Sequence, residues 1–288
     1  MSENARRPFN GHAANDSHDQ AQGPEGAVVP TVIRDNDKGR IAYDVYSRML
    51  DSNIVFVTHQ VEPMMANTIV AQMFHLYYDK IKPALDAATD ENGHTDLSKV
   101  PEDKRKIKMF INSPGGYVND GLQIYDAMQL MKSEGVIIET HATGIAMSMG
   151  SILLVGGSEG HRYSWPSANI MLHQVSGGAQ GTVKDMEISH EESRYLNERL
   201  KDVYRAHTDL TDDQLDIIFD RDYYIRGEEA KELGIIDHVK YPTNDPRVKE
   251  MLERQNRRHM EGEETVQEVK KTRVLREQPP APGPANNN

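Results

Sequence analysis

Residues 143–155 have the sequence TGIAMSMGSILLV, in which small residues precede an apolar run. Its first part, through Gly150, is small and flexible and predicts a tight turn, and the apolar run Ser151–Val155 predicts a helix directly behind it. A serine at such a turn stands clear of the backbone and faces the amide groups that open the helix. Ser148 is therefore a candidate nucleophile, although a serine before a helix is more often an N-cap.

Two other segments carry groups that a nucleophilic serine needs. Residues 111–118, INSPGGYV, predict a strand that ends in a Pro-Gly-Gly turn, whose unobstructed amides can converge on an anion. His173 follows the short apolar strand 169–172 and precedes a glycine-rich segment. Each has an ordinary structural explanation as a turn or a surface polar residue. With Asp222, however, the chain contains a nucleophile, a base, an orienting carboxylate and oxyanion donors.

From about Ala27 to Val239 the chain resembles the ClpP family of ATP-dependent serine peptidases, with one interruption near residues 77–107. The resemblance rests on several motifs in one order: DVYSRML at 44–50, QVE at 60–62, MANTIVAQM at 65–73, SPGG at 113–116, the Ser148 turn, His173-Gln174, GGAQG at 177–181 and EEAKELGIID at 228–237. It implies an α/β fold, the spiral of strand-strand-helix repeats that this family shares with crotonases. Residues 182–207 would form its protruding handle helix.

The resemblance also assigns roles to individual positions. It makes Ser148 the nucleophile, His173 the general base and Asp222 the carboxylate that orients the imidazole. The other matched positions contribute oxyanion-hole amides (Gly116 and Met149), a strand that pairs with the substrate (Gly177, Gly178 and Ala179) and a contact between rings (Asp220 and Arg221).

The same resemblance predicts how the enzyme is assembled and supplied. Members of the family form two stacked heptameric rings that enclose the active sites, so substrates must arrive unfolded. A strand that grips the substrate main chain selects weakly among side chains. The chain has no Walker-type phosphate loop, so the energy source would be a separate AAA+ unfoldase hexamer of the ClpX or ClpA type.

Three regions are expected along the chain. Residues 1–26 predict a disordered leader, which the enzyme is expected to remove from itself, and 27–242 the peptidase domain. Residues 243–288 predict a charged, largely disordered tail that begins as a frayed helix, in keeping with a mean hydropathy of −0.68. Within the domain, strands are predicted at 54–57, 107–111, 136–140 and 169–172 and helices at 64–82, 119–133, 149–155 and 182–207, an alternation that indicates an α/β core.

Composition argues against several other classes of protein. The chain has no cysteine, so disulfides and thiolate metal sites are excluded and a cytoplasmic location is expected. The chain contains no run of about 20 apolar residues, so no membrane span is predicted. A formal net charge of −12 argues against nonspecific nucleic-acid binding. The histidines show no metal-ligand spacing, and we predict neither a metal nor a cofactor.

Three alternatives to a Ser-His-Asp endopeptidase remain open. They are a noncatalytic or regulatory ring subunit, a crotonase-type acyl-CoA enzyme, and a Ser-Lys peptidase with Lys184 as base. The first would lack a member of the Ser-His-Asp set, the second would not need one, and His173 fits better than Lys184. Two departures from the family affect the expected details. Lys108 replaces an aromatic of the unfoldase-docking pocket, and Val175 replaces a proline, which is expected to loosen the substrate strand.

Overall fold

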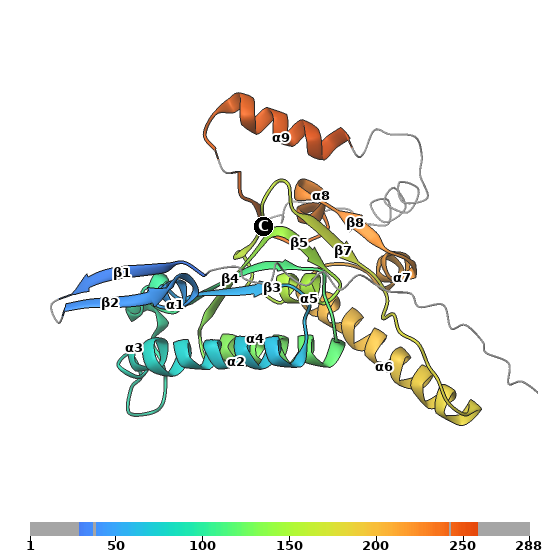
Figure 1. Ribbon diagram of the computed structural model, residues 1–288, viewed down its shortest axis with the longest axis horizontal. Coiled ribbons are helices and arrows are strands. Elements are labelled where there is room, and N and C mark those ends of the chain that lie inside the picture. The colour runs from blue at the N-terminus through green and yellow to red at the C-terminus, as the bar shows by residue number, and fades with distance from the viewer. Residues whose placement is uncertain (1–28, 37–38, 242, 259–288) are drawn as a thin grey trace, which may run out of the picture. The chain divides into compact units, whose positions relative to one another are not determined.

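A computed structural model describes residues 29–36, 39–241 and 243–258 (Figure 1). The chain divides into two compact units, Met1–Arg48 and Met49–Asn288. The predicted leader, residues 1–26, and the part of the predicted tail beyond residue 258 lie outside the described residues. Of that tail, the structure shows helix α9, Pro246–Arg258.

The described part of the first unit is a β-hairpin. Its two antiparallel strands are β1, Thr31–Asn36, and β2, Gly39–Asp44. Helix α1, Val45–Leu50, starts directly after β2 and extends across the boundary between the units. The Asp44 carboxylate accepts a hydrogen bond from the Ser47 N–H at 2.9 Å and caps this helix.

The second unit is built on a mainly parallel sheet that forks. Its strands are β3 (Ile54–Thr58), β4 (Lys106–Ser113), β5 (Ile137–Met147), β6 (Arg162–Ser164), β7 (Asn169–Leu172), β8 (Tyr223–Ile225) and β9 (His238–Val239). Strands β3, β4 and β5 are parallel neighbours. The first half of β5 then pairs with β6, which pairs with β9, and its second half pairs with β7, which pairs antiparallel with β8. The fork places the ends of β5 and β7 next to each other.

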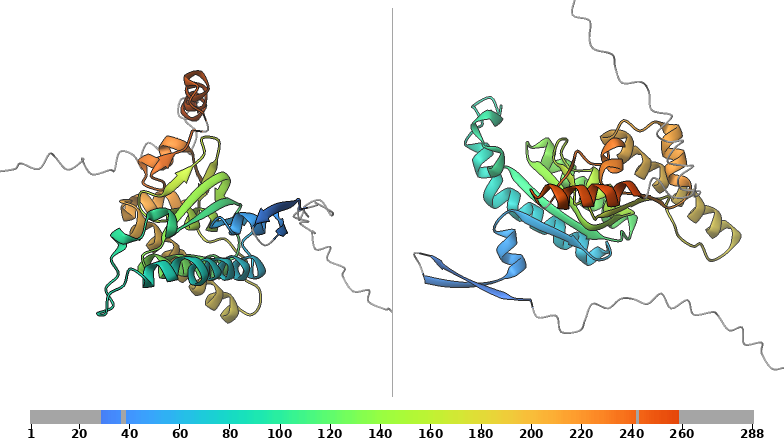
Figure 2. Two further views of the ribbon diagram at one scale, coloured as in Figure 1. Left: turned by 90° about the vertical axis from the view of Figure 1, so that its left-hand side faces the viewer. Right: turned by 90° about the horizontal axis from the view of Figure 1, so that it is seen from above.

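Three helices bury one face of this sheet. They are α2 (Pro63–Leu76), α4 (Val118–Ser133) and α5 (Met149–Val155), of which α2 and α4 run side by side (Figures 1 and 2). Alternate residues of the strands, such as Val57 and Met109, are fully buried in the core between sheet and helices. The other face of the sheet carries a row of neighbouring rings, one from each of β3, β4, β5, β6 and β9: Phe56, Phe110, His141, Tyr163 and His238.

Helix α6, Val183–His207, is the long helix that the resemblance predicts as the handle (Figure 1). It starts at a capping box formed by Thr182 and Asp185. One face of its second half is buried through Leu200, Lys201, Val203 and Tyr204. Its first half leaves four large apolar side chains exposed: Val183, Met186, Ile188 and Tyr195. Among the described residues, these four side chains are not covered by the rest of the chain. Helix α7 (Asp212–Asp220) and helix α8 (Gly227–Glu232) follow.

The predicted interruption near 77–107 consists of helix extensions and loops. Helix α2 continues through a π-helical turn, Tyr77–Ile81, into α3, Lys82–Asp86, so the helix predicted over 64–82 is confirmed and continues further. Two short 3₁₀ turns, Leu97–Lys99 and Glu102–Lys104, lead into β4.

One prediction of local structure is wrong. Residues 143–147 do not form a flexible turn but continue β5, so the turn is confined to Ser148. The side chain of Asn112 explains the difference, because its Oδ1 accepts a hydrogen bond from the Ile145 N–H at 3.1 Å where the β4–β5 register shifts. A side chain on Gly144 would collide with that amide, since a Cβ there would lie 2.4 Å from Oδ1.

Candidate active site

Ser148 lies at the junction between β5 and α5. Its φ of 52° and ψ of −122° are unusual for a residue with a side chain. The Ser148 N–H donates to the Met171 carbonyl of β7 at 2.9 Å, which ties the turn to the neighbouring strand. The sharp change of direction from strand to helix exposes the hydroxyl at the end of the sheet.

His173 is placed by the pairing of β5 with β7. Met147 of β5 is in register with Met171 of β7, so Ser148 and His173, which follow the two strand ends, lie close together. The Nε2 atom of His173 lies 2.8 Å from Ser148 Oγ, within hydrogen-bond distance. The imidazole is therefore positioned to take the proton of the hydroxyl.

Asp222 is placed by the pairing of β7 with β8, in which Leu172 is in register with Tyr223. Its Oδ1 lies 3.2 Å from Nδ1 of His173. The Asp222 side chain is 56% exposed, whereas that of His173 is 21% exposed. The structure thus brings together the three residues that the sequence predicted as a catalytic set, with the imidazole between the other two.

The Pro-Gly-Gly turn lies against the start of α5. It is held to the segment after β3 by hydrogen bonds from the Val61 N–H to the Gly115 carbonyl (2.7 Å) and from the Tyr117 N–H to the Val61 carbonyl (2.9 Å). A Cβ on Gly115 would lie 3.0 Å from the amide nitrogen of Met149, the first residue of α5. A first helical residue has no carbonyl four positions earlier in its helix, so this N–H is available to a ligand.

A cleft opens beside Ser148 and His173. Part of its wall comes from apolar and aromatic side chains of α4, α5, α6 and α7: Val118, Ile152, Leu200, Tyr204 and Phe219. The hydroxyl-bearing residues that line it are Ser148, Ser151, Ser176 and Tyr204. The cleft thus presents both apolar and hydroxyl-bearing side chains next to Ser148 and His173.

The predicted substrate strand borders this cleft. Residues 173–182 form neither helix nor strand, and Gly177, Gly178 and Ala179 are exposed with no atom within 4 Å of a Cβ built on either glycine. That Val175 loosens the substrate strand stays a prediction. The Val175 N–H donates to Asn197 Oδ1 of α6 at 3.0 Å, a bond that proline would not make.

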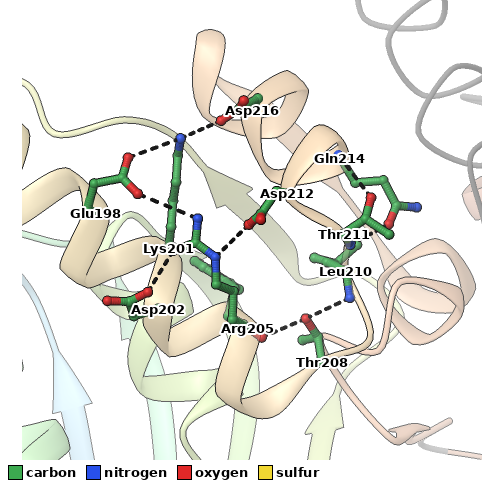
Figure 3. Close-up of polar contacts among 11 residues, drawn as sticks. Glu198, Lys201, Asp202, Arg205, Thr208, Leu210, Thr211, Asp212, Gln214 and Asp216 are labelled. Carbon is green, nitrogen blue, oxygen red and sulfur yellow. Dashed lines mark hydrogen bonds and ion pairs between the residues drawn. The ribbon is translucent and has the colours of Figure 1, made fainter.

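Asp220 and Arg221, the predicted contact between rings, lie at the end of α7 and are both exposed. The Asp220 carbonyl accepts a hydrogen bond from Gln174 Nε2 at 2.9 Å, which ties the end of α7 to the residue after His173. Ion pairs hold α7 to α6, from Lys201 to Asp216 at 2.6 Å and from Arg205 to Asp212 at 2.7 Å (Figure 3).

Three further points concern Lys184 as an alternative base, metal ligands and membrane-spanning helices. Lys184 is 79% exposed at the start of α6 and pairs with Glu187 at 3.1 Å, so it does not line the cleft beside Ser148. Within the described ranges, no group of three His, Cys, Asp or Glu side chains is arranged to hold a metal ion. None of the described helices has both the length and the apolar character needed to cross a membrane.

Local sequence patterns do not reveal the contribution of Ser151 and Tyr204. Their side-chain oxygens lie 2.8 Å apart although the residues are far apart in the sequence. Ser151 belongs to an apolar run and Tyr204 to a charged helix, and neither position has a motif. Only the packing of α6 against α5 brings them together.

Comparison with known proteins agrees with this geometry. The model of the family described as Clp protease matches residues 37–85 and 97–242, so the unmatched segment between them falls inside the predicted interruption. A protein of Deinococcus radiodurans named "ATP-dependent Clp protease proteolytic subunit" is 39% identical over 221 residues, which cover 77% of this chain and 96% of that protein.

Proposed function

This chain belongs to the Clp protease family, and we propose on that premise that it is a serine endopeptidase whose nucleophile, general base and orienting carboxylate are Ser148, His173 and Asp222. The observation that carries the proposal is the 2.8 Å separation of Ser148 Oγ and His173 Nε2, with Asp222 on the other ring nitrogen. A complete set favours an active subunit over a noncatalytic one. A crotonase-type acyl-CoA enzyme would not need this set.

The geometry supports a two-step acyl transfer. His173 removes the proton of Ser148 as Oγ attacks the peptide carbonyl, and Asp222 holds the imidazole in the productive tautomer and stabilises the cation that forms. The protonated His173 then passes its proton to the leaving amine. In the second step His173 activates a water molecule, which releases the acyl group from Ser148.

The amides of Gly116 and Met149 are the proposed oxyanion hole. Negative charge develops on the substrate oxygen in each tetrahedral intermediate, and fixed N–H donors stabilise it without reorganisation. Loss of one such donor typically costs about 3 kcal/mol of transition-state stabilisation. The approach of the Gly115-Gly116 turn to the start of α5 supports this role.

Residues Gly177, Gly178 and Ala179 are the proposed strand that pairs with an extended substrate. Their exposure beside the cleft leaves this backbone accessible to a peptide. Recognition by strand addition depends on main-chain hydrogen bonds, so many sequences would be accepted. Unfolded proteins, cut to short peptides, are the substrates that fit this mode of binding.

Self-assembly into two stacked heptameric rings is the second part of the proposal. The four exposed apolar side chains on the first half of α6 support it, because they offer an apolar surface to another subunit. Asp220 and Arg221 are the proposed contact between the rings. They adjoin Asp222, so a contact there would act on the segment that carries the orienting carboxylate.

The proposed partner is an AAA+ hexamer of the ClpX or ClpA type, which would unfold substrates and supply them with ATP-derived work. The name of the Deinococcus relative, with its reference to ATP, supports this part. Lys108 is half-buried on β4, two residues before Phe110 and on the same face, where an aromatic residue is usual. We expect Lys108→Tyr to strengthen binding of a ClpX-type hexamer, and unchanged binding would show that Lys108 lies outside the contact.

Peptide turnover tests the proposed function. The purified protein is expected to cleave short unstructured peptides without ATP, and Ser148→Ala is expected to reduce kcat by about 10⁴-fold or more. The particle mass of the variant, measured in parallel, shows whether assembly is retained. Equal turnover by the wild type and Ser148→Ala would contradict the proposal and favour a noncatalytic ring subunit.

A further inference from the structure

A chain of hydroxyl groups connects α6 to the backbone of Ser148. The Tyr204 hydroxyl lies 2.8 Å from Ser151 Oγ, which lies 2.7 Å from the Ser148 carbonyl oxygen. Tyr204 and Ser151 are 1% and 0% exposed, so these bonds form in the interior of the protein, at the inner end of the cleft. The resemblance and the triad geometry assign no role to either residue.

The direction of the hydrogen bonds follows from counting protons. A carbonyl oxygen only accepts, so the single hydroxyl proton of Ser151 is used in its bond to Ser148. Tyr204 must then donate to Ser151 Oγ. Burial raises the pKa of Tyr204 above its usual range, which keeps the phenol protonated and able to donate.

The chain of hydroxyl groups ends on Ser148, whose backbone conformation needs support. A residue with a side chain at a φ of 52° is held there only when its surroundings enforce the conformation. The carbonyl of Ser148 also accepts from the N–H groups of Ser151 (2.9 Å) and Ile152 (3.3 Å). The Ser151 hydroxyl bond is the shortest of the three and the one that depends on a residue outside α5.

The ring of Tyr204 also contacts the segment that leads to Asp222. It packs edge-on against Phe219 of α7, with the ring centroids 5.6 Å apart, three residues before Asp222. Lys201 of α6 also contacts Phe219, with Nζ 5.9 Å from the ring centre. It pairs with Asp216 of α7 (Figure 3). One turn of α6 therefore contacts the segments of both outer members of the triad.

We propose that Tyr204 is a positioning residue, which donates to Ser151 and through it holds the Ser148 carbonyl, so that the placement of α6 sets the placement of the nucleophile. This inference rests on the proposed function. It links the long helix, whose first half offers an apolar surface for assembly, to the chemical step. It predicts that the hydroxyl of Tyr204 contributes to the reaction of Ser148 and not to substrate binding.

The test compares Tyr204→Phe, Ser151→Ala and the double variant with the wild type in the full-length assembled protein. The measurements are the rate at which a fluorophosphonate probe labels Ser148, kcat and KM for an unstructured peptide, and particle mass. Tyr204→Phe is expected to lower the labelling rate and kcat by about 3- to 10-fold, the usual effect of one buried hydrogen bond, with KM and particle mass unchanged. Because both residues act in one chain, the double variant should match Ser151→Ala alone.

Tyr125→Phe is the matched control. It removes a tyrosine hydroxyl that lies 2.9 Å from Nε2 of His207, which is on the same helix but outside the chain to Ser148. In the Tyr125→Phe variant, the probe should label Ser148 at the wild-type rate. A wild-type labelling rate for Tyr204→Phe, additive effects of the two substitutions, or a loss that accompanies a smaller particle would each overturn the inference. Full turnover by Ser148→Ala would instead contradict the proposed function itself.

Discussion

Gly115 and Ser148 lie so close that a side chain at position 115 would occupy the space of the serine. A Cβ built on Gly115 would be 2.5 Å from the Ser148 Cβ and 2.8 Å from the Met147 carbonyl oxygen. The Pro-Gly-Gly turn and the Ser148 turn are thus packed backbone against backbone. Gly116, the next residue of the turn, lines the same cleft as Ser148.

The first prediction concerns that contact. Gly115→Ala should abolish most peptidase activity, because both turns must move apart to admit the methyl group. Gly160→Ala is the matched control, since Gly160 also has a positive φ (+77°, against +95° for Gly115) but has no atom within 4 Å of its Cβ position. The control should lose about 1–2 kcal/mol of stability from backbone strain and keep its activity. Similar activity in the two variants would show that close packing at Gly115 is unimportant.

The second prediction concerns the orienting carboxylate. Asp222→Asn should lower kcat by about 10³–10⁴-fold, because an amide in place of the carboxylate favours the wrong tautomer of His173 and does not stabilise the imidazolium. Asp213→Asn, which changes an exposed aspartate in the first turn of α7, is the control. If Asp222→Asn retained more than about a tenth of the wild-type kcat, the 3.2 Å contact with His173 would be incidental to the chemistry.

The third prediction concerns assembly. Arg221→Ala should lower peptidase activity and shift the particle from two rings towards one, because loss of the guanidinium removes a partner for a carboxylate across the ring contact. Sedimentation and peptide turnover are measured on the same samples. Arg247→Ala, which removes a 90% exposed arginine that pairs with Asp245, is the control and should change neither. A double-ringed and fully active Arg221→Ala particle would show that Arg221 is a surface charge only.

The fourth prediction concerns pH. Burial, with the nearby charges of Lys132 and Arg162, lowers the pKa of His207 to about 4 from an ordinary value of 6.5. Between those values the unfolded chain binds a proton that the folded chain does not, so stability should fall as the pH drops from about 6.5 to about 4. The expected loss is about 1–2 kcal/mol, reduced for the partial exposure of the ring.

Urea unfolding at several pH values tests this prediction in the Ser148→Ala background, which prevents self-digestion. His207→Gln should flatten the pH dependence within that window. His75→Gln, a change of a half-exposed histidine on α2, should leave it as in the parent. An unchanged slope in His207→Gln would mean that another group accounts for the acid sensitivity.

Sequence patterns were sufficient for much of the fold. Apolar periodicity predicted the helices at 119–133, 149–155 and 182–207 and the strand at 169–172 within a residue or so of the observed α4, α5, α6 and β7. These elements bury apolar residues at regular spacing, and Thr182 and Asp185 mark the start of α6 by a local capping motif. For these elements the signal is local, and the prediction is confirmed.

The failures arise where distant residues determine the structure. Residues 143–147 are extended because Asn112 of the neighbouring strand supplies an acceptor to Ile145, and small residues alone suggested a turn. Periodicity in α6 does not distinguish apolar residues that are buried in the chain's own core from apolar residues that serve assembly. The pairing of Ser151 with Tyr204 depends on the tertiary packing of α5 against α6 and has no local signal.

The most direct test of the central claim is to locate the residue that a fluorophosphonate modifies. The account predicts that intact protein and peptide mapping will show one label per chain on Ser148, that His173→Ala will label far more slowly, and that Ser148→Ala will neither be labelled nor cleave peptides. Modification at another residue, or peptide cleavage by Ser148→Ala at the wild-type rate, would contradict it.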